Sequence, residues 1–358
     1  MSGGEIVGGE VLLEVADLSV SFPTDAGLAR AIEGVSFVLR EGETVGIVGE
    51  SGSGKSMTAM AIMGLLPKRA VVTGSIRFRG QELVGMSDAA LREIRGKDIA
   101  VVFQDALTAL NPVMRVGEQL IEAVRVHRPD TTTAERRERA IELLDIVGIP
   151  SPELRVDRYP HEFSGGMRQR VMIAMSIANE PDLLIADEPT TALDVTVQAQ
   201  VLEVLREVQR RTGTTVLLIT HDLGVVAGTA DRVLVMYAGG LVETADVDPL
   251  FYETAHPYTA GLLASLPRID RRASRDERLY QIAGQPPVAT AWPSGCRFAP
   301  RCAHAVAGLC DVVVPPAVPV GADGFAIDVA AGTDVSRPAG IHTAACVRIG
   351  EWQKEAVL

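Results

Sequence analysis

The feature that most constrains this chain of 358 residues is a glycine-rich stretch near its start, residues 49–56 (GESGSGKS). It fits the pattern G-x-x-x-x-G-K-[ST], follows an apolar strand-like stretch at residues 44–48 and precedes a helical run. Glycines let successive backbone N–H groups point inward around a phosphate chain, and the helix N-terminus adds a positive dipole. The stretch therefore predicts a phosphate-binding loop, in which Lys55 reaches the β- and γ-phosphates of a nucleotide and Ser56 ligates Mg²⁺.

A second apolar stretch, residues 183–186, ends in two acids, Asp187 and Glu188. We expect Asp187 to hold Mg²⁺ through its water shell and Glu188 to polarise an attacking water. Taken alone, such a pair is more often a solvated strand end. Next to a phosphate-binding loop, the pair favours nucleotide hydrolysis.

Periodicity predicts an α/β fold with a helical insertion. Strand-like stretches lie at residues 11–22, 35–39, 44–48, 183–186 and 215–219. The last two are apolar throughout and enclose a helical pattern at residues 195–211, which predicts a βαβ crossover in a parallel sheet covered on both faces. Residues 115–160 are helical in pattern, whereas beyond about residue 257 Pro and Gly increase and the periodicity fades.

Composition excludes several classes of protein. A hydrophobic fraction of 47% excludes a mainly disordered chain, and a net charge of −12 argues against nucleic acid as the main partner. No apolar run reaches the roughly 18 residues that span a bilayer, since the longest, residues 57–66, is interrupted by Thr58 and Gly64. The first ten residues lack the basic and apolar regions of a secretory signal, so we expect a cytoplasmic protein.

Residues 163–170 (FSGGMRQR) lie between the loop and the acidic pair, and here the chain resembles the ABC transporter ATPases. Their LSGGQ-like turn opens a helix, although Phe163 and Met167 stand here where Leu and Gln are usual. The resemblance implies that Ser164, Gly165 and Gly166 grip the γ-phosphate held by an opposite subunit, so that hydrolysis needs a dimer. It also implies an ABC-type P-loop core, a mixed sheet with antiparallel N-terminal strands.

The resemblance extends to further residues in chain order. It implies that Phe22 stacks on adenine, that Gln104 touches Mg²⁺ and senses a membrane partner, and that His221 contacts the γ-phosphate. Residues 192–194 (ALD) would cross the dimer interface, and Met57 would keep only a backbone contact to phosphate. The predicted catalytic residues are Glu188, His221 and Gln104; the Mg²⁺ ligands are Ser56, Gln104 and Asp187; and the nucleotide-binding residues are Phe22, Gly49, Ser51, Gly52, Ser53, Gly54, Lys55, Ser56, Met57, Gln104, Asp187, Ser164, Gly165 and Gly166.

Three stretches resemble the oligopeptide/dipeptide permease branch of that family. They are residues 103–112 (FQDALTALNP), 256–259 (HPYT) and 284–302, which includes GQPP and GCRFAPRC. This implies an ATPase domain at residues 1–256, with a helical subdomain at about 105–165, and a C-terminal extension at residues 257–358. It further implies a peripheral ATPase subunit at the cytoplasmic face of the cell (inner) membrane, paired with a second ABC ATPase in a heterodimer, beneath two transmembrane permease subunits and fed by an extracytoplasmic solute-binding protein.

Other functions stay open at this point. The subfamily also carries nickel and other small solutes. A soluble ABC protein of DNA repair or translation is disfavoured, because this chain has one phosphate loop and no long coiled coil. A regulatory module, with the C-terminal part sensing redox state or a metal, is permitted by the cysteines but not required by them.

All four cysteines lie in the C-terminal part: Cys296, Cys302, Cys310 and Cys346. Disulfides are unusual in a cytosolic chain, and four thiolates can ligate either zinc or an iron–sulfur cluster. Because the tight C-x2–4-C spacing of zinc ribbons is absent, we predict a [4Fe–4S] cluster with a structural role. The alternatives are a zinc site, in which His304 or His342 could replace a thiolate, and four unligated thiols.

Overall fold

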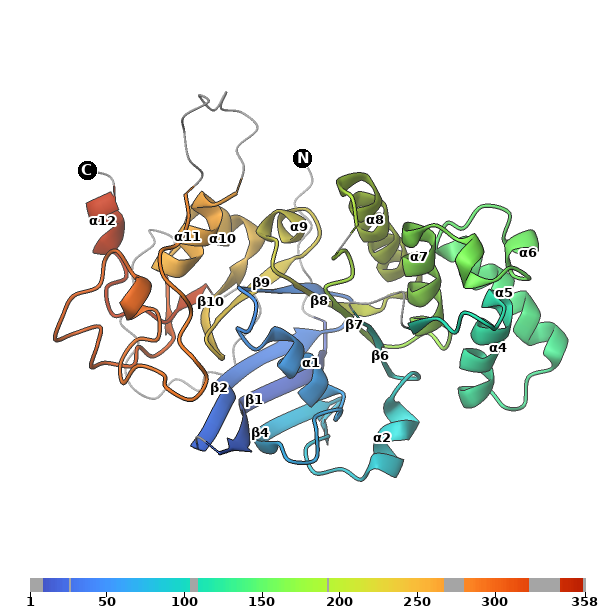
Figure 1. Ribbon diagram of the computed structural model, residues 1–358, viewed down its shortest axis with the longest axis horizontal. Helices are drawn as coiled ribbons and strands as arrows, with labels where there is room; N and C mark the ends of the chain where they lie inside the picture. The colour runs from blue at the N-terminus through green and yellow to red at the C-terminus, as the bar shows by residue number, and fades with distance from the viewer. Residues whose placement is uncertain are drawn as a thin grey trace. The chain divides into compact units, whose positions relative to one another are not determined.

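The computed structural model describes residues 9–25, 27–103, 109–191, 193–266, 280–321 and 342–356 (Figure 1). Contacts divide the chain into two compact units, each assembled from separate stretches of sequence. The first unit consists of Met1–Leu13, Leu39–Thr44 and Phe78–Ile219. The second consists of Glu14–Val38, Val45–Arg77 and Thr220–Leu358.

The first unit contains a parallel sheet with strands in the order β8 (Thr215–Thr220), β7 (Leu183–Asp187) and β6 (Ile99–Val102). Every residue of β7 and β8 is buried, which explains their unbroken apolar sequences. Helix α8 (Val195–Thr212) connects these two strands. The βαβ crossover predicted from the sequence is therefore confirmed.

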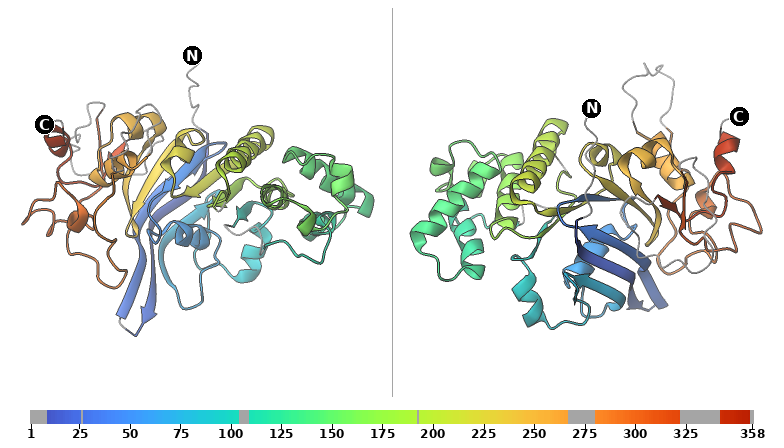
Figure 2. Two further views of the ribbon diagram at one scale, coloured as in Figure 1. Left: turned by 45° about the horizontal axis from the view of Figure 1, so that its top comes forward. Right: turned by 180° about the vertical axis from the view of Figure 1, so that it is seen from behind.

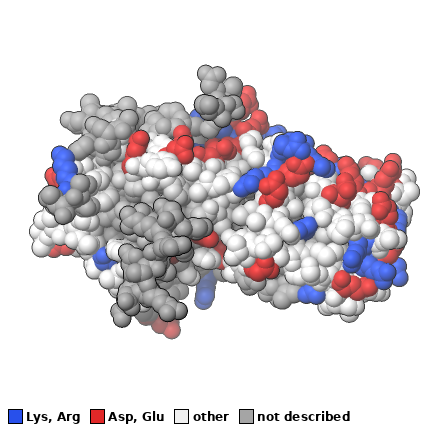
Figure 3. All heavy atoms as spheres, turned by 90° about the horizontal axis from the view of Figure 1, so that it is seen from above, with Lys and Arg blue, Asp and Glu red and all other residues white. Residues whose placement is uncertain are grey.

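Helices form most of the rest of the first unit. They are α2 (Asp88–Ile94), α4 (Val116–His127), α5 (Thr133–Ile146), α6 (Pro152–Arg155), the short 3₁₀ helix η1 (Pro160–Glu162) and α7 (Gly165–Ser176), with a two-residue strand β5 (Gln81–Glu82) before them. Helices α4, α5 and α7 pack on one another, and α8 contacts α5 and α7 (Figure 1). Helices α4 to α6 fall within the stretch predicted to be helical. Acidic and basic side chains are intermixed on the face of these helices seen in Figure 3, which indicates a solvated surface.

The second unit contains a mixed sheet with strands in the order β11 (Val318–Pro319), β12 (Thr343–Ala344), β10 (Gly240–Asp246), β9 (Arg232–Tyr237) and β3 (Thr44–Val48). Strands β3 and β9 are parallel, and the other pairs are antiparallel. Helix α1 (Lys55–Ile62) follows β3, and helices α9 (Leu223–Ala227), α10 (Val247–Tyr252) and α11 (Pro257–Ala264) complete this part. Figure 2 shows α10 and α11 beside β9 and β10 from two further sides.

A separate, antiparallel N-terminal sheet places β1 (Val11–Thr24) between β2 (Gly27–Arg40) and β4 (Val71–Phe78). The α/β fold with antiparallel N-terminal strands is thus confirmed, but β2 is longer than the predicted residues 35–39. In its first half only Ile32 is buried, whereas in its second half buried residues alternate with less buried ones, so the strand pattern is clear only there.

The C-terminal part has more regular structure than its sequence indicates. Besides the short 3₁₀ helix η2 (Ala299–Arg301) and helix α12 (Trp352–Ala356), it supplies β11 and β12 to the sheet of the second unit. Each of these strands is two residues long, which is too short for alternation to be recognised. Phe298 from this part is buried in the same core cluster as Val48, Tyr237 and Tyr258.

Candidate nucleotide-binding site

The glycine-rich loop connects β3 to α1 in the second unit, as predicted. Gly49 has a φ of 154°, and a Cβ atom there would lie 2.1 Å from the carbonyl oxygen of Met236. Only glycine therefore fits at the end of β3, where the backbone passes this close to Met236 on β9. Gly52, with a φ of 77°, has no atom within 4 Å of the position of a Cβ, so the loop leaves space on that side.

Two polar side chains of the loop are arranged for an anionic ligand. Lys55 is 5% exposed, and its ammonium donates hydrogen bonds to the carbonyl oxygens of Gly49 at 2.7 Å and Glu50 at 3.0 Å. The Ser53 hydroxyl is buried and has no hydrogen-bond partner in the described structure. Because an unsatisfied buried hydroxyl is costly, this donor fits a loop completed by a phosphate oxygen.

The second unit also holds further predicted residues. Phe22 is half-buried on β1, and His221 is exposed directly after the end of β8. Ser56 and Met57 are half-buried in the first turn of α1, and Ser51 is exposed in the loop before it.

In the first unit, the acidic pair lies at the carboxyl end of β7. Asp187 is the last residue of the strand and is 9% exposed. Glu188 follows with a φ of 47°, in the left-handed region that side chains rarely adopt. Its backbone N–H donates to Ile219 at 2.8 Å, and its carboxylate accepts a hydrogen bond of 2.8 Å from the Thr191 hydroxyl. The strained backbone and this bond fix the direction of the Glu188 side chain.

The Ser-Gly-Gly turn opens α7 as predicted. Ser164 is the N-cap residue, and its hydroxyl accepts a hydrogen bond of 3.3 Å from the N–H of Met167. A Cβ at Gly165 would meet no atom within 4 Å, whereas one at Gly166 would lie 2.3 Å from Cγ1 of Val197 on α8. Gly166 is therefore required for the packing of α7 on α8, a role that the motif alone does not reveal.

Two predicted positions lie outside the described residues: Gln104 and Ala192. Next to the latter, Asp194 is the N-cap residue of α8 and accepts hydrogen bonds from the N–H groups of Thr196 and Val197. Its carboxylate thus has a local structural role.

Sequence analysis missed the residues that hold the loop from the C-terminal part. The N–H of Glu50 donates to the Tyr258 hydroxyl at 2.9 Å, and its carboxylate accepts two hydrogen bonds from the Arg301 guanidinium, at 2.7 and 3.0 Å. His256 in turn accepts a hydrogen bond of 3.1 Å from the N–H of Tyr258, and burial lowers the pKa of His256 to about 4, so the ring is neutral. The HPYT and GCRFAPRC stretches could have been identified as candidates for this role only through their tertiary contacts.

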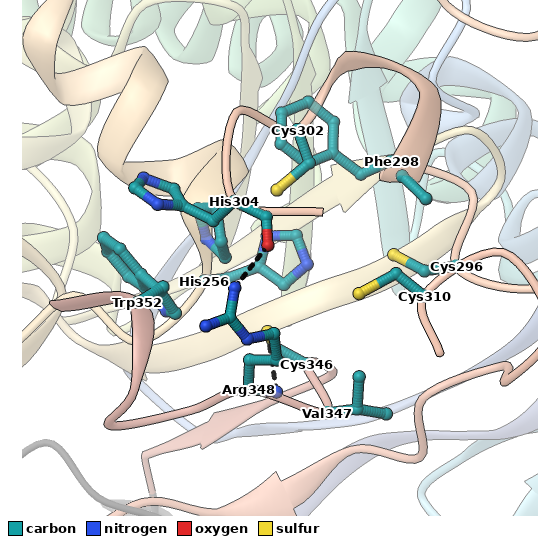
Figure 4. A pocket seen from close by; sticks show the side chains of 12 residues that line it. His256, Cys296, Phe298, Cys302, His304, Cys310, Cys346, Val347, Arg348 and Trp352 are labelled. Atoms are coloured by element: carbon teal, nitrogen blue, oxygen red, sulfur yellow. Dashed lines mark hydrogen bonds between the residues drawn. The ribbon is translucent and has the colours of Figure 1, made fainter. Parts of the chain in front are cut away.

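The four cysteines line one pocket of the second unit, together with Phe298, His304 and Trp352 (Figure 4). Its cavity of about 20 Å³ has room for roughly one water molecule. Among the described residues, no three His, Cys, Asp or Glu side chains lie close enough together to hold a metal ion. Burial raises the pKa of Cys346 to about 12 and raises those of Cys296 and Cys302, which favours neutral thiols. As placed, these residues do not fit the predicted [4Fe–4S] cluster, nor a zinc site with His304 or His342.

Two protein-family models match stretches of the chain that include the phosphate-binding loop and the C-terminal residues around it. The ABC transporter family matches residues 32–191, and the oligopeptide/dipeptide transporter C-terminal region matches residues 242–310. The oligopeptide transport ATP-binding protein OppD of Bacillus subtilis is 54% identical over 297 residues, which cover 82% of each chain. The chain belongs to the ABC transporter ATP-binding proteins of the oligopeptide/dipeptide group. The resemblance drawn from its motifs is confirmed.

Other relatives carry related names. The dipeptide transport ATP-binding protein DppD of Bacillus subtilis is 52% identical over 86% of this chain and 90% of its own length. OppD of Mycobacterium tuberculosis is 56% identical over 81% of this chain but only 47% of its own. This chain thus spans about half the length of the mycobacterial relatives it matches.

Solved structures support the fold. The ATP-binding cassette MJ0796, a dimer in a post-hydrolysis state with ADP and Pi, has a TM-score of 0.59 and 28% identity, covering 66% of this chain and 99% of its own. The protein cbiO1 of Clostridium perfringens, part of the transporter complex cbiONQ, has a TM-score of 0.58 and 29% identity, covering 68% and 91%. Within the described residues, no helix combines the length and hydropathy that crossing a membrane requires.

Proposed function

We propose that this chain is the ATP-hydrolysing subunit of an ABC importer for oligopeptides or dipeptides. The observation that carries the proposal is the loop between β3 and α1, with Lys55 buried against loop carbonyls and the Ser53 hydroxyl buried without a partner. Both groups suit a polyphosphate, and the relatives named for oligopeptide and dipeptide transport support the substrate class.

The predicted residues take the following roles. Gly49 and the loop residues from Ser51 to Met57 bind the phosphates of ATP, and Phe22 stacks on its base. Ser56, Gln104 and Asp187 hold Mg²⁺, which neutralises charge on the phosphates. Glu188 orients the attacking water, and His221 senses the γ-phosphate. The constrained backbone and the Thr191 hydrogen bond favour Glu188 for this task, since a water-orienting group needs one fixed direction.

We further propose that the chain works in a complex at the cytoplasmic face of the membrane. Ser164, Gly165 and Gly166 contact nucleotide on a second ABC ATPase, and two permease subunits and an extracytoplasmic binding protein complete the importer. In this arrangement residues 1–256 form the ATPase domain and residues 257–358 the extension. Affinity purification from detergent-solubilised membranes tests this proposal: recovery of two membrane subunits and a second ATPase supports it, and recovery of the chain alone contradicts it.

The hydrolytic role is tested with Glu188→Gln. This change keeps the shape and the hydrogen-bonding capacity but removes the charge that polarises water, so turnover falls by roughly 10²-fold while ATP binding persists. Glu203→Gln, at an exposed residue of α8, is the control and keeps wild-type turnover. Hydrolysis at the wild-type rate by Glu188→Gln would contradict the assignment.

A finer proposal concerns the four cysteines. Four thiols are a complete ligand set, and all of them line one pocket, so we propose that they take up a metal centre, [4Fe–4S] in preference to zinc. Uptake of the metal would draw the four side chains closer together, because the cavity that they now line has room for roughly one water molecule. Protein purified without oxygen is expected to be brown and to contain about four irons per chain. If the protein instead contains one zinc per chain, the site is a zinc site and the cluster is rejected. If it contains neither iron nor zinc, both metal centres are rejected.

A further inference from the structure

Glu50, the second residue of the phosphate-binding loop, is held by the C-terminal part at three of its atoms. Its N–H donates to the Tyr258 hydroxyl, and its two carboxylate oxygens accept from Nη1 and Nη2 of Arg301. The Arg301 side chain is only 5% exposed, and it is fixed further by donating to the carbonyl oxygens of Ile282 and Ala283. The paired geometry makes this a directional contact as well as an ion pair.

The same residue contacts the functional end of the loop. The carbonyl oxygen of Glu50 accepts hydrogen bonds from the Lys55 ammonium at 3.0 Å and from the N–H of Ser53 at 3.2 Å. These are the lysine and the serine whose buried polar groups suit a phosphate. A displacement of the Glu50 backbone would therefore displace the atoms that hold both.

Charge gives the contact a second effect. Glu50 places a carboxylate, 27% exposed, in a loop that is to bind a polyanion, where like charges repel. The Arg301 guanidinium bonds both of its oxygens and so offsets that charge. Without the arginine, the carboxylate would both lose its anchor and oppose the phosphates.

We infer that Arg301 and Tyr258 are positioning residues, through which the C-terminal extension holds the phosphate-binding loop in its ligand-ready conformation. The inference rests on the proposed function, in which this loop binds ATP. Restraining a loop before binding lowers the ordering cost at the moment of binding, so the extension contributes to nucleotide affinity without touching the nucleotide.

The test compares two arginines of one segment in the full-length chain. Arg301→Gln is expected to raise the Kd for ATP with Mg²⁺ about tenfold, the scale of a lost charged hydrogen-bond pair. Arg297→Gln is the matched control, because Arg297 also pairs with an acid, Glu33, and stacks 3.8 Å from the Trp292 ring centroid. We expect Arg297→Gln to loosen the extension as much as Arg301→Gln does, which the thermal midpoint of unfolding measures. It should leave the Kd for ATP unchanged.

A double variant separates positioning from general loosening. If Arg301 acts through Glu50, the effect of Arg301→Gln on the Kd shrinks in a Glu50→Gln background, since the two changes break one contact. Additive effects, or an equal rise in Kd with Arg297→Gln, would overturn the inference. If Lys55→Ala abolishes binding while Arg301→Gln binds like the wild type, only the positioning role fails. If the wild-type chain binds no ATP, the proposed function fails as well.

Discussion

Two glycine- and serine-containing turns each open a helix in this protein, yet they leave their hydroxyl groups in opposite states. Before α1, the Ser53 hydroxyl is buried without a partner. Before α7, the Ser164 hydroxyl accepts a hydrogen bond from Met167 and so caps its own helix. The first turn is incomplete until something binds to it, whereas the second is already a finished N-cap. Similar composition therefore does not imply a similar need for ligand.

The largest expected effect comes from the first turn. Lys55→Ala removes the buried cation, and we expect the Kd for ATP to rise by about 10²-fold or more, because several charge-assisted hydrogen bonds are lost. Equilibrium binding of ATP measures this effect. Lys68→Ala, at an exposed lysine of the same unit, is the control. Equal affinities for both variants would show that the unpartnered turn is not a phosphate site.

The next effect concerns the two glycines of the second turn. Gly166→Leu places atoms against Val197 and should destabilise the first unit by about 1–3 kcal/mol, the usual cost of overpacking. Gly165→Ala fits the open space and should keep or raise the thermal midpoint. Gly165→Ala is therefore the cleaner probe of a contact in trans: it should slow hydrolysis at the partner's site while this chain's own ATP affinity stays constant. Unchanged hydrolysis in the assembled complex would count against that contact.

The smallest effect should come from Ser164→Ala. Loss of the N-cap hydrogen bond is expected to cost about 1 kcal/mol of stability, measured by denaturant unfolding. ATP affinity of the same chain should not change, because the proposed contact of Ser164 is with nucleotide on the second ATPase. A marked loss of that affinity would mean that the two turns act on one nucleotide, and the comparison would fail.

Local patterns predicted the parts of this structure that depend on neighbouring residues in sequence. The glycine-rich loop, the buried strands β7 and β8 and the helix α8 between them follow from composition and period, and each was found where expected. The loop geometry agrees with its composition, since Gly49 is needed where the backbone passes close to Met236 on β9.

Contacts between residues distant in sequence could not be predicted in this way. Glu50 and Arg301 are 251 positions apart, and nothing around either residue indicates the other. The cysteines show a second limit: four thiols in one segment predict a shared ligand, but the structure spreads them around a cavity of about 20 Å³. The sequence shows which metal-ligating side chains are available, but their spacing does not show whether the fold brings them together.

The pairing of β12 with β10 has a consequence for the order in which the protein is made. Strand β10 ends at Asp246, but its partner, Thr343–Ala344, is synthesised roughly a hundred residues later. Until then, one side of β10 carries backbone groups with no strand to bond them, and an open strand edge readily pairs with other chains. Thr343 and Ala344 thus cover the edge of β10 at Glu243 and Thr244. A chain whose synthesis stops before β12 would keep this strand edge open to pairing with other chains, even with an intact phosphate-binding loop.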